Sequence, residues 1–305
     1  MPQTLSSTGS APGLAYRHGV LLVLLAGACW STMGLGIRQM EVANVWQILF
    51  YRSCALTPFL FLIIGWRSQG RPLTVIRRAG PVAAIGGIGL VFAFSGGIYA
   101  IQTTTVANAM FLFASAPFAA ALLGWLLLRE KVRQATWWAM AVAAVGIAIM
   151  VIEGIELGHG VGNMAALASA LGFAAFTIVL RWGKLSDMMP SVLWSGVFAI
   201  GVAGIVCSLE GHSLAIPWND ILIALAMGIF QVGLGLALYT HGSTAVPAAE
   251  LALLSMTEVL LGPLWVWLFL GETAAFYTLL GGGILMAALV GNALSGLRRP
   301  TTPMM

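Results

Sequence analysis

Long, uninterrupted apolar runs are the feature that most constrains how this chain can fold. Only 8% of its residues are charged, whereas soluble domains have roughly 25%. In lipid the backbone must satisfy its own hydrogen bonds, so helices or a closed barrel are required, and barrel strands would alternate apolar and polar residues. The continuous runs therefore predict an all-α integral membrane protein. Ten transmembrane helices are expected near 18–39, 43–65, 79–100, 104–128, 134–152, 161–182, 189–208, 218–241, 246–270 and 274–296.

The basic residues predict the orientation of these helices. If the N-terminus is cytoplasmic, 12 of the 14 basic residues fall on the cytoplasmic side, as the positive-inside rule requires. The external breaks carry acids instead, among them Glu153 and Glu272. Both termini are therefore expected in the cytoplasm. The basic isoelectric point then reflects loops against anionic headgroups, and no nucleic-acid partner is expected.

An internal match divides the chain into two similar halves. Residues 113–131 lie over 255–273 at an offset of 142, and 19–38 lie over 162–181 at an offset of 143. Each half has five spans, so the second copy enters the membrane from the other side. Inverted repeats of this kind are common in carriers that open to each side in turn. The expected organisation is a disordered N-terminal tail over 1–16, five-helix repeats over 17–153 and 160–297, and a short basic C-terminal tail over 298–305.

The sequence resembles the drug/metabolite transporter superfamily, specifically its ten-helix EamA-type members. The resemblance rests on residues 28–31 (ACWS), residues 50–52 (FYR) and the paired segments SAPFAAALLGWLLLREKV and TEVLLGPLWVWLFLGET. It covers 17–297. The family has an acid and a proline midway through the fourth and ninth helices; here Glu258 keeps the acid and Pro117 the proline, while Val259 replaces the second proline. The resemblance implies a transporter of small molecules in the bacterial inner membrane.

Ionisable groups inside the membrane are the default functional candidates because they are costly to insert. Arg52 lies about 13 Å down its helix; it either binds an anionic substrate group or is a structural arginine that pairs with a carbonyl or a glutamate. Glu258 either binds an ammonium group or a proton, or is the partner of Arg52 or of a helix end. Glu250, two turns earlier, is a candidate at the cytoplasmic mouth.

Uncharged polar and aromatic residues supply further candidates for substrate binding. Trp30 lies mid-span and either packs in the core or lines a cavity. Tyr99 and Tyr239 occupy corresponding repeat positions, where tyrosine either anchors the membrane interface or faces the substrate. The remaining candidates lie on helix faces with other polar residues: Asn108, Gln231 and Trp265.

These features favour a secondary transporter that exports a small amphipathic metabolite, such as an amino acid, by alternating access at a midplane cavity. A multidrug efflux carrier that depends on Glu258, or a passive facilitator or channel, remains an alternative. No enzyme motif, cofactor site or metal site is apparent. The expected partners are a small-molecule substrate and membrane lipid.

Glycine-containing segments suggest two further hypotheses. Gly96 and Gly235 would allow their helices to bend during gating. Gly283, Ala287 and Gly291 form a small-residue stripe on the last helix, which would serve either a homodimer contact or packing within the monomer.

Overall fold

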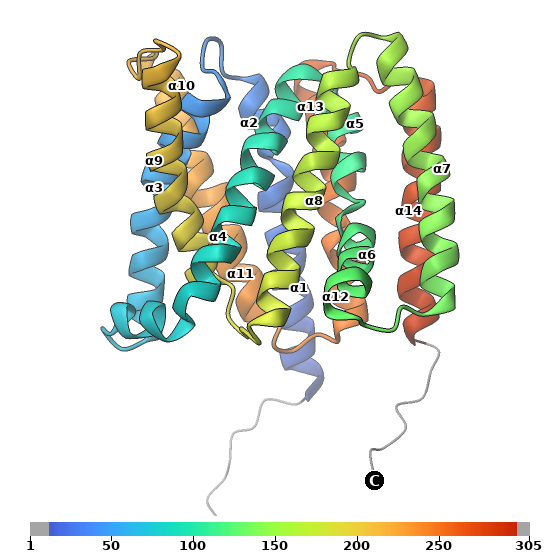
Figure 1. Ribbon diagram of the computed structural model, residues 1–305, viewed down its shortest axis with the longest axis horizontal. Coiled ribbons are helices and arrows are strands. Elements are labelled where there is room, and N and C mark those ends of the chain that lie inside the picture. The colour runs from blue at the N-terminus through green and yellow to red at the C-terminus, as the bar shows by residue number, and fades with distance from the viewer. Residues whose placement is uncertain (1–11, 298–305) are drawn as a thin grey trace, which may run out of the picture.

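The computed structural model describes residues 12–297. All secondary structure in this part of the chain is helical, and it contains no strand (Figure 1). Ten helices are long and apolar enough to cross a membrane. The ten predicted spans are therefore confirmed. The basic tail over 298–305 and residues 1–11 of the N-terminal tail lie outside the described residues, and the rest of the N-terminal tail overlaps the start of the first helix.

Six spans are single helices and four are interrupted. The single helices are α3 (Val45–Arg67), α4 (Pro72–Thr103), α7 (Gln134–Glu156), α8 (Gly160–Trp182), α9 (Met189–Leu209) and α14 (Phe276–Leu297). The interrupted spans are α1 (Pro12–Ser31) with α2 (Met33–Arg38), α5 (Val106–Phe113) with α6 (Ala116–Leu128), α10 (Trp218–Ala226) with the π-helix η1 (Met227–Leu234) and α11 (Gly235–Gly242), and α12 (Ala248–Ser255) with α13 (Thr257–Leu270).

Local hydrogen bonding accounts for two of the interruptions. Between α1 and α2, Ser31 and Thr32 donate their hydroxyls to the carbonyls of Ala28 and Cys29, both at 2.7 Å. Between α5 and α6, Ser115 donates to the Leu112 carbonyl at 2.6 Å. Such bonds offer the backbone an alternative to the helical ladder and bend helices.

Helix α4 begins earlier than the sequence predicts. The expected third span starts at residue 79, whereas α4 starts at Pro72. Gly80 has a φ of 63°, a left-handed conformation inside the helix, and Pro81 follows it. The first part of α4 is therefore a separate helical segment set at an angle to the membrane-spanning part, which the hydropathy pattern alone would not include.

The spans form one bundle in which consecutive spans run antiparallel (Figure 1). Helix α4 packs along α8 and α9, α1 packs against α11 and α13, and α3 packs against α9. Helices α7 and α14 lie side by side at one edge of the bundle. Helix α1 begins and α14 ends at the same end of the bundle. The loops after α3, α6 and α8 also lie there and carry basic residues, so we call it the basic end. We call the other end of the bundle the opposite end.

Helices α7 and α14 approach each other backbone to backbone. A Cβ added at Gly146 would lie 2.5 Å from the carbonyl oxygen of Gly281, and the reverse substitution would meet the Gly146 carbonyl at the same distance. By contrast, a Cβ at Gly283 or Gly291 would meet nothing within 4 Å. These two glycines of the predicted stripe therefore do not serve packing within the monomer, and the homodimer contact stays a prediction.

Polar contacts join α7 and α14 at both of their ends. Near the opposite end, the Glu153 carboxylate accepts from the Thr278 hydroxyl at 2.8 Å. Near the basic end, the Asn292 side-chain oxygen accepts from the Thr136 hydroxyl at 2.8 Å. The glycine contact between these points leaves the two helices tied along most of their length.

Candidate functional site

Aromatic side chains gather around the break between α1 and α2. The Trp30 and Tyr239 rings lie 5.3 Å apart between centroids. Trp265 donates its indole N–H to the Ser31 hydroxyl at 2.8 Å. Trp30, Tyr239 and Trp265 are all half-buried. Three candidates from separate spans are therefore brought together by the first span, at mid-membrane depth.

Arg52 is enclosed in the bundle. Its side chain is fully buried, and its guanidinium carbon lies 4.6 Å from the centre of the Phe94 ring on α4. The Nε and Nη2 atoms have no hydrogen-bond partner within residues 12–297. The cation–π contact offsets part of the burial cost, but buried donors without acceptors remain unfavourable. Two of its guanidinium nitrogens are therefore left without an acceptor among the described residues.

Glu258 lies in the first turn of α13, immediately after the break at Met256. Its side chain is half-buried, and it forms no hydrogen bond or ion pair with any described residue. A carboxylate in the first turn is favoured by the helix dipole. The alternative in which Glu258 pairs with Arg52 is wrong: α13 packs on α1, α2 and α5, whereas α3 packs on α4, α9 and η1.

Asn108 and Glu250 already have protein partners. Asn108 is buried on α5 and donates its amide to Thr104 Oγ1 at 3.1 Å and also to Asn163 on α8. Glu250, in the first turn of α12, accepts from the Tyr16 hydroxyl at 2.5 Å. These contacts give both residues a structural role as helix contacts at opposite ends of the bundle.

Gln231 and Tyr99 take no part in the contacts among Trp30, Tyr239 and Trp265. Gln231 belongs to the π-helix, and its side-chain oxygen has no partner within the described residues. It helps to line a hollow of about 270 Å³ together with Thr32 and Gln39. Tyr99 is 39% exposed near the end of α4, which suits an interfacial residue better than a buried site.

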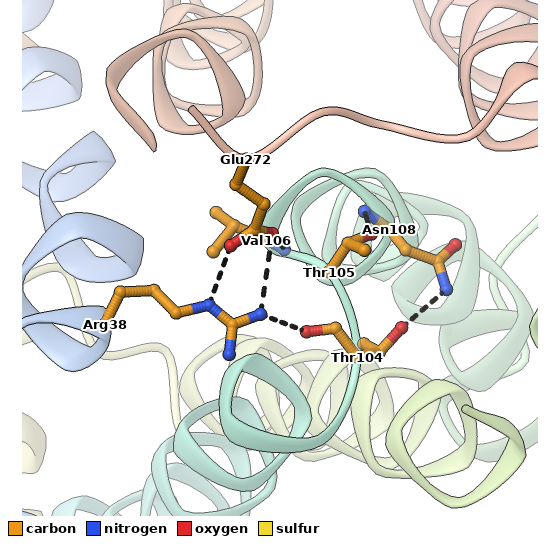
Figure 2. Close-up of polar contacts among 6 residues, drawn as sticks. All are labelled: Arg38, Thr104, Thr105, Val106, Asn108 and Glu272. Atoms are coloured by element: carbon orange, nitrogen blue, oxygen red, sulfur yellow. Dashed lines mark hydrogen bonds and ion pairs between the residues drawn. The ribbon is translucent and has the colours of Figure 1, made fainter. Parts of the chain in front are cut away.

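An ion pair that sequence reasoning missed joins four segments at the opposite end (Figure 2). Arg38 donates from Nε to Glu272 at 2.8 Å and from Nη2 to the Thr104 carbonyl at 2.7 Å. Glu272 also accepts from the backbone N–H of Val106 at 2.7 Å, at the first residue of α5. The Arg38–Glu272 network thus ties α2, the ends of α4 and α13, and the start of α5.

A second ion pair lies at the basic end. Arg181, at the end of α8, pairs with Glu130, just after α6. The side chains of Arg181 and Glu130 are 47% and 36% exposed. Those of Arg38 and Glu272 are only 27% and 21% exposed. The repeat alignment could have indicated both pairs, because it places Arg38 over Arg181 and Glu130 over Glu272.

The fold and these charges define a class of protein. Ten membrane-spanning helices, interrupted helices at mid-membrane depth and unpaired charges in the interior are typical of solute carriers. Within residues 12–297 no group of three histidine, cysteine or acidic side chains could hold a metal ion.

The family description "EamA-like transporter family" matches residues 17–152 and again 160–294. Because these segments cover most of the chain, the protein belongs to the EamA-like transporter family, as the resemblance implied. It is therefore a multi-pass membrane transporter and not an enzyme.

Relatives that match most of the chain have similarly low sequence identity to it. The pseudopaline exporter CntI of Pseudomonas aeruginosa is 24% identical, over 90% of this chain and 95% of its own. Human solute carrier family 35 member G1 is 24% identical, over 93% of this chain and 80% of its own. A solved crystal structure of a protein aligns with a TM-score of 0.63 at 19% identity, over 92% of this chain and 98% of that one, which supports the fold.

Proposed function

We propose that this protein is a secondary transporter that exports a small amphipathic metabolite, such as an amino acid, by alternating access at a midplane cavity. The observation that carries the proposal is a pair of opposite charges inside the bundle, Arg52 and Glu258, which form no ion pair with any of the residues 12–297. A zwitterion offers a carboxylate to the first and an ammonium to the second.

The aromatic group supports a substrate with an apolar part. Trp30, Tyr239 and Trp265 lie around the first-span break, next to α13, which carries Glu258. A Cβ added at Gly27 on α1 would lie 3.6 Å from the Glu258 backbone nitrogen. The first turn of α13, which carries Glu258, and the aromatic rings therefore lie beside the same helix, α1.

We propose that the two halves, 17–153 and 160–297, are inverted repeats. Three observations support this organisation. The family description matches the chain twice. The α1–α11 contact has its counterpart in the α8–α4 contact. The fourth and ninth spans are interrupted at Ser115 and Met256, which occupy nearly the same repeat position.

The unequal ion pairs suggest how alternating access proceeds. The Arg38–Glu272 network has two additional backbone contacts, to Thr104 and Val106, whereas Glu130 and Arg181 are more exposed. In our proposal this conformation is sealed at the opposite end. Breaking this network while the Glu130–Arg181 pair stays formed would open the opposite end.

We assign the basic end to the cytoplasm and the protein to the bacterial inner membrane. Positive charge concentrates in the loops at the basic end, as the positive-inside rule requires. The sealed opposite end would then face outward. Export of a metabolite is the activity printed in the name of the Pseudomonas relative, and it supports the same direction here.

Counterflow in proteoliposomes tests this proposal. Vesicles containing the protein are loaded with one unlabelled amino acid and exposed to a trace of the same labelled compound, across a panel of amino acids. We expect saturable uptake that depends on internal substrate. Vesicles with the surface variant Arg77→Gln serve as a matched control and should behave as wild type.

Two outcomes would contradict the proposal. A flux that does not saturate and shows no stimulation by internal substrate would indicate a passive facilitator or channel. Absence of amino-acid counterflow, combined with drug resistance in an expressing strain, would indicate a multidrug carrier that uses Glu258 for cations.

A further inference from the structure

A hollow of about 610 Å³ opens on the surface where α6 ends and α7 begins. It is lined by Trp125 and Leu126 from α6, Trp137 from α7, and Arg129 and Lys131 from the loop between them. These two spans meet at the basic end of the bundle, so the hollow lies at the level where the acyl chains of the bilayer give way to the headgroups.

The charge of the hollow is positive and uncompensated. Arg129 and Lys131 form no hydrogen bond or ion pair through their side chains within residues 12–297. Glu130, the acid that also lines the hollow, is already paired with Arg181 on α8. Two cations beside a neutralised acid favour an anionic occupant.

The backbone holds these cations in an uncommon geometry. Arg129 has a φ of 55°, which few non-glycine residues adopt. The Glu130 N–H donates to the Gly124 carbonyl at 3.1 Å, which closes the end of α6 around this residue. Arg129 and Lys131 therefore line one hollow while Glu130, between them in the chain, reaches Arg181.

The wall of the hollow is aromatic and apolar. The Trp125 and Trp137 rings are 5.3 Å apart at an interplanar angle of 86°. Trp125 and Leu126 are 45% and 55% exposed. Tryptophan prefers the membrane interface because its ring is amphipathic. An occupant with an anionic head and an aliphatic chain would satisfy both the cations and this wall.

We propose that this hollow binds an anionic phospholipid, with the headgroup phosphodiester at Arg129 and Lys131 and an acyl chain along Trp125 and Leu126. The site is distinct from the candidate substrate site, since none of its residues belongs to the spans that carry Arg52, Trp30 or Glu258. The proposal does not depend on which metabolite is transported.

Native mass spectrometry of the full-length, delipidated protein tests the site. Binding of phosphatidylglycerol is compared with that of phosphatidylcholine carrying the same acyl chains. The variant R129Q/K131Q should lower phosphatidylglycerol affinity about tenfold or more, because each basic side chain near the surface contributes to anionic-lipid binding. The control R77Q/R78Q removes two exposed charges from α4, whose first segment also begins at the basic end, and should retain wild-type affinity.

Two further measurements distinguish folding effects and free anions. Lys131→Gln alone removes no hydrogen bond or ion pair made by the described residues, and it should lower the affinity several-fold while keeping the protein monodisperse. Glycerol 3-phosphate has the head without the chain and should not compete with the lipid. Equal loss in the R77Q/R78Q control, equal binding of the two lipids, or effective competition by glycerol 3-phosphate would each overturn the proposal.

Discussion

At the scale of single residues, Arg52 makes the most specific prediction about substrate. Replacing Arg52 with Gln keeps a buried polar group but removes the charge. We expect the KM for carboxylate-bearing substrates to rise at least about tenfold, because a hydrogen bond to a charged group contributes about 1.5–3 kcal/mol. Amines lacking the carboxylate should be affected less. Equal loss for both classes in proteoliposome counterflow would mean that Arg52 has only a structural role.

Glu258 predicts a separation between exchange and driven transport. If Glu258 carries the coupling proton, Glu258→Gln should keep substrate exchange but lose accumulation driven by a pH gradient. If it binds the substrate ammonium, both activities should fall. Counterflow and gradient-driven uptake in the same vesicles separate these results. Wild-type activity in both assays would remove Glu258 from the site.

Asp220 predicts a loss of stability without a change in substrate affinity. It is fully buried at the start of α10 and accepts from the backbone N–H groups of Glu41, Val42 and Ala43 at 3.0–3.2 Å. Asp220→Ala would leave these donors without that acceptor, so we expect about 2–3 kcal/mol lower unfolding free energy.

Thermal unfolding in detergent checks this value, together with the KM of the folded fraction. The control Glu41→Ala removes a nearby acid but leaves the backbone donors in place, and it should unfold like wild type. An unchanged transition in Asp220→Ala would show that the loop contact is not stabilising.

Sequence alone identified the interior charges but not the ion pairs at the bundle ends. Arg52 and Glu258 interrupt apolar runs, where any charge is conspicuous. Arg38 and Glu272 lie at span ends, where charges are ordinary, and they are 234 residues apart. The structural role of Asn108 could not be predicted either. Its hydrogen-bond partner Asn163 belongs to the other half of the chain.

At the scale of elements, hydropathy predicted the spans but not their interruptions. An apolar run has the same composition whether it forms an α-helix, a break or a π-helix. The break after Ser31 depends on hydroxyls that bond back to the helix, and the π-helix η1 packs where Gly228 lies against α3. These tertiary conditions cannot be read from local periodicity.

Gly235 provides a test of how closely α11 must approach α1. A Cβ there would lie 2.4 Å from the Trp30 indole nitrogen. Gly235→Ala should therefore cost about 1–3 kcal/mol through overpacking and slow counterflow. The matched control Gly201→Ala on α9 adds a methyl group in open space and should be neutral.

A second substitution identifies the cause. Trp30→Phe removes the indole nitrogen, and in the Gly235→Ala background it should restore part of the lost stability. Simple addition of the two single effects on thermal unfolding would contradict the proposed contact.

At the scale of the whole molecule, the fold class and the number of spans followed from the sequence, because bilayer thickness and backbone hydrogen bonding leave few choices. The packing order did not. Helix α7 lies along α14 because Gly146 meets Gly281, and α4 lies along α8 because Gly172 meets the Ala93 backbone. These contacts appear only in the folded chain.

The two ion pairs predict opposite shifts in conformation. Glu272→Gln weakens the seal at the opposite end by about 1–3 kcal/mol, which changes the ratio of the two conformations about 5- to 150-fold. Spin labels at Val42 and Leu157, exposed residues of loops at that end, should report longer distances in a cysteine-free background.

Glu130→Gln is the matched comparison at the basic end. It should leave the Val42–Leu157 distance distribution at its wild-type value or shift it towards shorter distances. The same lengthening in both variants would argue that these ion pairs act on stability rather than on access.

The α7–α14 contact has a mechanical consequence. Polar bonds at both ends and a glycine contact between them fix these helices to each other, whereas the broken spans lie in the rest of the bundle. The pair is suited to act as a stator, a stationary frame against which the other helices rock. A bulky residue at Gly146 should therefore prevent the chain from folding. The rate of transport would depend on the helices outside this pair.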